Sequence, residues 1–167
     1  MILFEKDFRI ALSLRDKLRG SGLTLCTVES LTAGAVGNLI ASVSGASEYY
    51  AGTLVVYNLQ QKVHWLGIDM EHAERVNCVS QRVADEMATS ARAQFGTDIV
   101  ISTTGYAEPP HPKDSPTPYA FITILFGDGK IRLRYDGDEY TTRLEMQHVI
   151  AVKALEVLLR GLEELSV

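Results

Sequence analysis

The stretch Thr27-Val28-Glu29-Ser30-Leu31-Thr32-Ala33-Gly34 decides how the chain is organised, because an apolar run ends within it and a helical pattern begins. Residues 23–28 are predicted to form a strand, and residues 32–42 carry the apolar spacing of a helix. Ser30 would then stand at the carboxyl end of the strand, which is where open α/β sheets bind ligands. A serine at this junction would equally suit a helix cap, so both interpretations stay open.

The rest of the chain alternates helix and strand patterns and then turns into a hairpin. Gly127-Asp128-Gly129 between two β-rich runs is a strong hairpin signal, and Thr142 with Glu145 forms a capping box for a last helix. Residues 53–57 are nearly continuous in apolar character, so we expect that strand to be buried on both faces. The predicted helices cover residues 4–19, 32–42, 59–66, 81–95 and 143–162, and the predicted strands cover 23–28, 53–57, 99–103, 119–126 and 130–135.

This order of elements predicts an α/β protein, a three-layer α/β/α sandwich with a mixed sheet. The 167 residues suit one domain, and neither a linker nor an internal repeat divides residues 1–167. A loop over residues 106–118 holds all five prolines of the chain.

The composition and charge of the chain indicate which kinds of partner and which cell location to expect. The chain is 46% hydrophobic and 22% charged, as in ordinary globular proteins, and its formal net charge is −5. It has no long Lys/Arg run, so we expect no nucleic-acid partner, and no apolar stretch long enough to cross a membrane. The N-terminus does not resemble a secretory signal, and Cys26 and Cys78 lack metal-type spacing, so we expect a cytoplasmic location.

The candidate site follows from the topology. If the first three strands run parallel, their carboxyl ends meet at one edge of the sheet, near Ser30, Asn58 and Thr104. The side chains that this edge would gather carry hydroxyl, phenol, amide and amine groups. They belong to Ser30, Thr32, Tyr57, Asn58, Lys62 and Thr104.

A serine and a lysine without a well-placed histidine suggest acyl transfer. Ser30 would attack a carboxamide, and Lys62 would take the hydroxyl proton if burial kept its amine neutral. N–H groups at the start of the following helix would hold the oxyanion. The alternatives are a capping Ser30, a solvated Lys62 and a Tyr57 that is only a rim aromatic. For Glu29, bonds to backbone donors of the next turn are favoured over an acid–base role.

Several motifs follow one another along the chain: residues 29–34, residues 44–47, Tyr57 with Lys62, residues 66–68, Val79-Ser80 and Thr104-Gly105. Together they resemble the CinA C-terminal domain family, which also occurs as stand-alone nicotinamide-nucleotide amidases. Residues 29–34 match its E-S-[LC]-T-[GA]-G signature, and residues 44–47 match its P-G-A-S element with Ser44 in place of proline. Tyr57, Lys62 and the Leu-Gly-Ile at 66–68 follow in family order, although Asn58 sits one place early. Val79-Ser80 and Thr104-Gly105 complete the matches.

The resemblance implies an α/β/α fold and hydrolysis of nicotinamide mononucleotide to nicotinate mononucleotide and ammonia, with no metal or other cofactor. It implies a small-molecule nucleotide as substrate and association into a homo-oligomer. By the same match Ser30 is the nucleophile, Lys62 its base and Tyr57 a supporting hydroxyl. The substrate-binding positions implied are Thr32, Gly34, Ser47, Asn58, Thr104 and Gly105.

The chain departs from the family pattern in the segment that follows Thr104-Gly105. A glycine-rich T-G-I-A-G-P-x-G-G becomes Thr-Gly-Tyr-Ala-Glu-Pro-Pro-His-Pro over residues 104–112. Glu108 replaces a glycine and adds negative charge, while prolines remove N–H donors. Two classes of function therefore stay open: an amidohydrolase acting on a pyridine nucleotide, or a catalytically weak or inactive paralogue that binds nucleotides or other partners.

Overall fold

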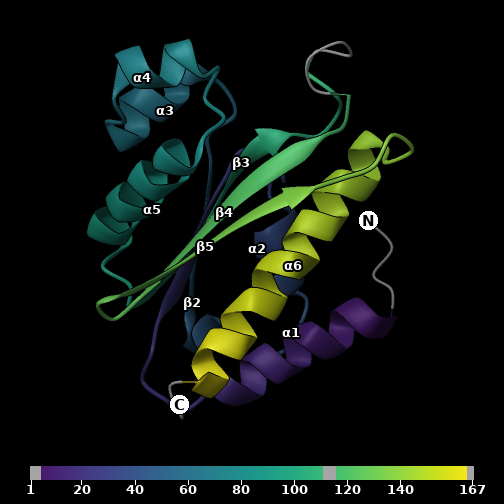
Figure 1. The fold of residues 1–167 in the computed structure, drawn as a ribbon. Coiled ribbons are helices and arrows are strands. Elements are labelled where there is room, and N and C mark those ends of the chain that lie inside the picture. The colour runs from purple at the N-terminus through teal and green to yellow at the C-terminus, as the bar shows by residue number, and fades with distance from the viewer. Residues whose placement is uncertain (1–4, 111–115, 165–167) are drawn as a thin grey trace.

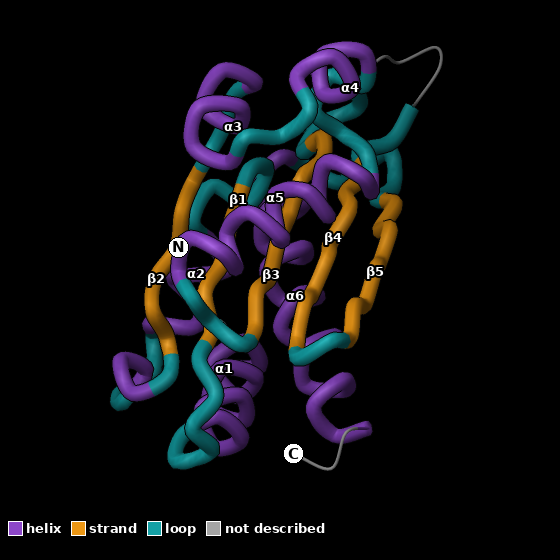
Figure 2. The backbone as a smooth tube through the Cα atoms, turned by 90° about the vertical axis from the view of Figure 1, so that its left-hand side faces the viewer, coloured by secondary structure: helices purple, strands orange, loops and turns teal. Residues whose placement is uncertain are grey.

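A mixed five-stranded sheet forms the middle layer of the protein, in a computed structural model that describes residues 5–110 and 116–164. The strand order is β2-β1-β3-β4-β5, which Figure 2 shows from one edge to the other. β1 pairs in parallel with β2 and β3, whereas β3, β4 and β5 pair antiparallel. The strands are β1 Leu25–Glu29, β2 Tyr50–Val55, β3 Ile99–Tyr106, β4 Tyr119–Phe126 and β5 Gly129–Asp136.

Helices cover both faces of this sheet. α1, α2 and α6 lie on one side and α3, α4 and α5 on the other, as Figure 1 shows. The three-layer α/β/α sandwich with a mixed sheet is therefore confirmed. The helices are α1 Glu5–Leu18, α2 Ala35–Ala41, α3 Leu59–Leu66, α4 Met70–Arg75, α5 Gln81–Phe95 and α6 Arg143–Glu164, with a 3-10 turn η1 at Ala46–Glu48.

The protein has two hydrophobic cores, one on each face of the sheet, because successive side chains of the central strands point to opposite faces. Leu25 and Ile101 point toward α1, α2 and α6, while Cys26, Val28 and Val100 point toward α5. Every residue of β1 is buried, because this strand has a neighbour on each edge and helices on both faces. None of the helices in the described part of the chain is long and apolar enough to span a membrane.

The predicted hairpin and capping box are confirmed. Phe126 pairs with Gly129 across a two-residue turn in which Gly127 adopts a φ of 50°. At the start of α6, the Thr142 N–H donates to the Glu145 carboxylate (2.9 Å), and the Glu145 N–H donates to the Thr142 hydroxyl (3.3 Å).

Other boundaries differ from the prediction for physical reasons. β2 begins at Tyr50 and ends at Val55, and it lies at the sheet edge with alternating exposure, so the expectation that it is buried on both faces is wrong. α4 was not predicted, because its six residues are too short to show a periodic pattern. The expected helix start at residue 4 and the loop residues 111–115 lie outside the described residues.

Candidate active site

A cavity of about 560 Å³ opens where β1 and β3 end. This is the edge of the sheet at which the sequence predicted a site. Its walls come from the segment after β1, the start of α3, the turn before α5, the end of β3 and the first residue of α6. The main polar side chains on these walls belong to Ser30, Tyr57, Asn58, Lys62, Asn77, Cys78, Thr104, Glu108 and Arg143.

Ser30 and Lys62 meet inside this cavity, as predicted. Lys62 Nζ donates a hydrogen bond to Ser30 Oγ over 2.8 Å and a second one to the Tyr57 carbonyl over 3.3 Å. The Lys62 side chain is buried, with only 1% of the residue exposed, and Ser30 is 6% exposed. Lys62 is therefore not the solvated group of the alternative interpretation, and Ser30 does not cap α2, whose N-cap position is Gly34.

The electrostatic setting of Lys62 favours a neutral amine. Burial lowers its pKa below the ordinary lysine value, and the neighbouring Cys78 thiol opposes this effect less strongly. Among the described residues, no carboxylate forms an ion pair with Lys62. An uncompensated buried ammonium is costly, so the uncharged form is stabilised relative to a lysine in water.

The start of α3 holds Lys62 in place. Asn58 caps this helix, and its side-chain oxygen accepts the Gln61 N–H over 2.9 Å. Lys62 follows one turn later and shares its helix face with the buried Leu66. The cap thus fixes the register that turns Lys62 inward, and Asn58 itself lies on the cavity wall.

Glu29 explains how Ser30 is presented. Its fully buried carboxylate accepts the backbone N–H groups of Gly34 (2.9 Å), Val36 (3.2 Å) and Gly37 (2.8 Å). It also accepts the hydroxyl of Thr32 over 2.6 Å, and Gly34 has a φ of 97°, which an L side chain would strain. The structural role favoured for Glu29 is confirmed.

This network corrects one expectation about catalysis. The N–H groups at the start of α2 bind the Glu29 carboxylate, so they are not the oxyanion donors that the sequence suggested. The helix starts at Ala35 instead of Thr32, because the intervening turn wraps around this carboxylate. The side chain of Thr32 and the backbone of Gly34 point to Glu29 and do not line the cavity.

Tyr57 is placed differently from the prediction. Its hydroxyl accepts a hydrogen bond from Arg143 Nη1 over 3.2 Å, and 57% of the residue is exposed. The phenol is therefore engaged at the mouth of the cavity, and the part of Tyr57 that contacts the Ser30–Lys62 pair is its backbone carbonyl.

Two further predicted positions reach the cavity and one does not. Thr104 lines the wall and donates its hydroxyl to the Cys78 carbonyl over 2.7 Å. Gly105 lies beside it, where a Cβ would come within 2.5 Å of the Tyr119 carbonyl, so close packing against β4 explains this glycine. Ser47 belongs to η1, which precedes β2 and therefore lies at the opposite end of the parallel strands.

Arg143 was missed by reasoning from the sequence. Its guanidinium donates to Glu108 through Nε (3.0 Å) and through Nη2, and it also contacts Tyr57. The capping box at Thr142 and Glu145 marked the beginning of the helix. Nothing in the local pattern showed that the first turn of α6 would reach the carboxyl ends of β1 and β3.

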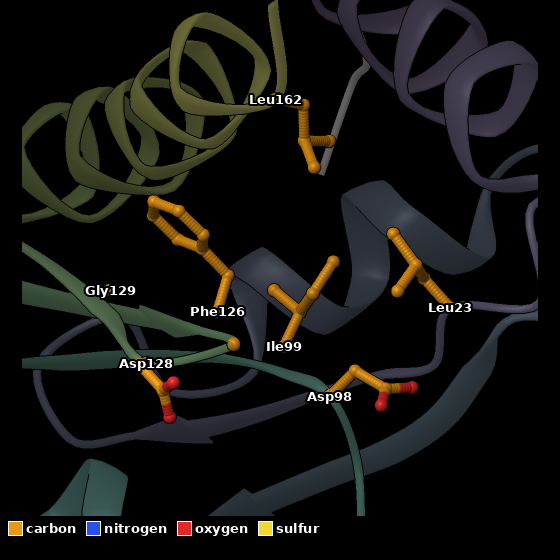
Figure 3. Close-up of a pocket in the computed structure, with 8 residues that line it drawn as sticks. Leu23, Asp98, Ile99, Phe126, Asp128, Gly129 and Leu162 are labelled. Atoms are coloured by element: carbon orange, nitrogen blue, oxygen red, sulfur yellow. The ribbon is translucent and has the colours of Figure 1, made fainter. Parts of the chain in front are cut away.

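A second cavity, of about 310 Å³, lies at the other end of the sheet and is largely apolar (Figure 3). Leu23, Phe126 and Leu162 provide most of its apolar wall, and Asp98 and Asp128 stand at its border. The described residues that line it include no serine, lysine or cysteine, so the Ser30–Lys62 cavity is the better candidate for chemistry.

The fold and this cavity define an α/β protein with a buried serine–lysine pair at the carboxyl edge of its sheet. The chain belongs to the CinA C-terminal domain family, whose profile matches residues 7–162. A CinA-like protein of Flavobacterium psychrophilum is 42% identical over 106 residues, which make up 64% of this chain and 25% of that protein.

Other relatives match a longer part of the chain. A putative competence-damage inducible protein of Streptococcus pneumoniae is 29% identical over 161 residues, 95% of this chain and 38% of that protein. A crystal structure of a competence or damage-inducible protein from Enterobacter asburiae has a TM-score of 0.84 at 26% identity, covering 93% of this chain and 98% of that one. The chain spans only 25% and 38% of the length of these two curated relatives.

Proposed function

We propose that this chain is an amidohydrolase that releases ammonia from the carboxamide of a pyridine nucleotide, nicotinamide mononucleotide being the first candidate. The observation that carries the proposal is the 2.8 Å contact between Lys62 Nζ and Ser30 Oγ inside a cavity. Membership of the CinA C-terminal domain family is compatible with this activity.

The reaction would proceed in two halves. Neutral Lys62 takes the Ser30 hydroxyl proton while Ser30 Oγ attacks the carboxamide carbon. The resulting Lys62 ammonium protonates the amide nitrogen, the C–N bond breaks, and ammonia leaves. Water, deprotonated by the regenerated amine, then attacks the acyl ester, and Ser30 departs with its proton restored. The product is the corresponding carboxylate.

The oxyanion needs a donor other than the start of α2. Leu31 follows the nucleophile directly and lines the cavity. Within the described residues its backbone N–H donates no hydrogen bond, in contrast to those of Ser30 and Ala33. We assign it as an oxyanion donor, a role for which one group is typically worth about 3 kcal/mol in the barrier.

A nucleotide substrate also needs a counter-charge for its phosphate. Among the described residues of the cavity wall, Lys62 and Arg143 carry the basic side chains, and Lys62 is required in its neutral form. Arg143 is thus the group suited to the phosphate, because a guanidinium binds oxyanions through paired N–H donors. Its existing pairing with Glu108 opposes phosphate binding, which favours the second candidate function, a chain with little turnover.

Ammonia release from nicotinamide mononucleotide by the purified chain tests the proposal, with a panel of related carboxamides alongside. We expect turnover by the unmodified chain and none by Ser30→Ala, with little change in Tm. Ser13→Ala, on an exposed part of α1, is the matched control and should keep full activity. No turnover of any carboxamide, or full activity in Ser30→Ala, would contradict the proposal.

A further inference from the structure

A chain of polar contacts crosses the mouth of the candidate active site. Arg143, at the start of α6, donates to Glu108 through Nε and Nη2 and to the Tyr57 hydroxyl through Nη1. These three residues come from segments far apart in the sequence, yet all of them line the cavity that contains Ser30 and Lys62. The Arg143 guanidinium thus binds both the Glu108 carboxylate and the Tyr57 phenol of the same chain.

The opposite charges of Arg143 and Glu108 balance each other at the mouth of the cavity. The hydrogen bond to Glu108 is the largest effect that raises the pKa of Arg143, so the guanidinium stays cationic at all relevant pH values. Glu108 Oε2 accepts hydrogen bonds from both Nε and Nη2 of this guanidinium. These two N–H donors are the ones that suit a bidentate oxyanion. An anionic group entering the cavity would therefore find these donors of Arg143 already bound to Glu108.

We propose that Glu108 is a specificity-determining residue, an internal competitor that occupies Arg143 and must be displaced by the phosphate of a phosphorylated substrate. This inference rests on the proposed function for the identity of the carboxamide. It predicts that Glu108 weakens the binding of phosphorylated carboxamides while leaving unphosphorylated ones nearly unaffected.

Displacement is energetically feasible. The side chains of Arg143 and Glu108 are 46% and 57% exposed, and ion pairs of that kind are screened by water and contribute little. A phosphate offers about two charges and three acceptor oxygens, so it is the stronger partner for the guanidinium. Glu108 would nevertheless lie beside the bound phosphate, where like charges repel.

The test compares two ligands that differ only in the phosphate, nicotinamide mononucleotide and nicotinamide riboside. Their Kd values are measured by calorimetry on the full chain carrying Ser30→Ala, so that no turnover interferes. Adding Glu108→Gln should lower the Kd of the mononucleotide about tenfold and change that of the riboside by less than twofold. Arg143→Gln, added to Glu108→Gln, should remove the gain.

Glu163→Gln is the matched control, because it makes the same charge change far from the cavity. Glu163 lies twenty residues after Arg143 on α6, which corresponds to about 30 Å along the helix axis. It should alter neither Kd. Unchanged or weaker mononucleotide binding in Glu108→Gln, an equal gain for both ligands, or binding of neither ligand would overturn the inference. If the binding pattern is as expected but the unmodified chain releases no ammonia, the proposed hydrolysis fails while the role of Glu108 stands.

Discussion

Glu29 lies at the end of β1 with its carboxylate wholly inside the protein. Three backbone N–H groups and several threonine hydroxyls donate to it, including those of Thr32 and Thr53. These bonds compensate the burial of a charged group and tie the end of β1 to the start of α2. Ser30 is the next residue, so its position depends on this network.

Glu29→Gln should therefore destabilise the protein strongly. The amide has one acceptor oxygen where the carboxylate has two, and its NH2 group would face backbone N–H groups that are themselves donors. We therefore expect a loss of about 2–4 kcal/mol in the free energy of unfolding. Urea denaturation measures it. Glu48→Gln, which removes the charge from an exposed pair with Arg19, should change the free energy of unfolding far less. Equal effects of the two changes would contradict the anchoring role.

Single residues also show where prediction from the sequence stops. The meeting of Ser30 and Lys62 could be predicted, because it follows from parallel strands ending at one edge. The orientation of Tyr57 could not, because it depends on Arg143, which is 86 positions away in the chain. The oxyanion assignment failed because the side chain of Glu29 competes for the same N–H groups.

At the scale of elements, α3 links stability to chemistry. Asn58 caps the helix that carries Lys62, and it also lies on the cavity wall, so one side chain has two candidate roles. Asn58→Ala should cost about 1 kcal/mol of stability and lower kcat, because the first turn of α3 loosens. Asn58→Ser keeps a capping oxygen and separates the two roles.

If capping is the whole role of Asn58, Asn58→Ser should restore both the free energy of unfolding and kcat/KM. Recovery of stability without recovery of kcat/KM would show instead that the amide contacts the substrate. Thermal unfolding and steady-state kinetics on the three proteins provide the comparison.

Element positions were predictable where a local signal fixes them. The caps Asn58 and Ser80 and the hairpin glycines mark boundaries that the structure shares. β2 was misjudged because its apolar run looks like a central strand, whereas position at an edge is set by the order of pairing.

At the scale of the whole molecule, the two edges of the sheet differ. The exposed positions of β5 carry charged residues such as Lys130, Arg132 and Arg134, which discourage strand pairing. The exposed positions of β2 are uncharged, and Val55 is 42% exposed. We therefore propose that copies of the chain associate through the β2 edge.

Light scattering after size-exclusion chromatography checks this expectation. The mass should be at least twice the 18.4 kDa of one chain, and Val55→Lys should shift it toward 18.4 kDa by placing charge on the edge. Thr89→Lys, on the exposed face of α5, controls for the added charge and should leave the mass unchanged. A monomeric unmodified chain would contradict the proposal.

If a neutral Lys62 activates Ser30, the pH dependence of kcat/KM for ammonia release must follow the titration of the Lys62 amine. Activity should rise as the amine loses its proton and level off with an apparent pKa below the ordinary lysine value of about 10.4, because burial lowers the pKa of Lys62. Lys62→Arg, which cannot deprotonate in this range, should lose nearly all activity and the rise with it. An unchanged profile in Lys62→Arg would contradict the account.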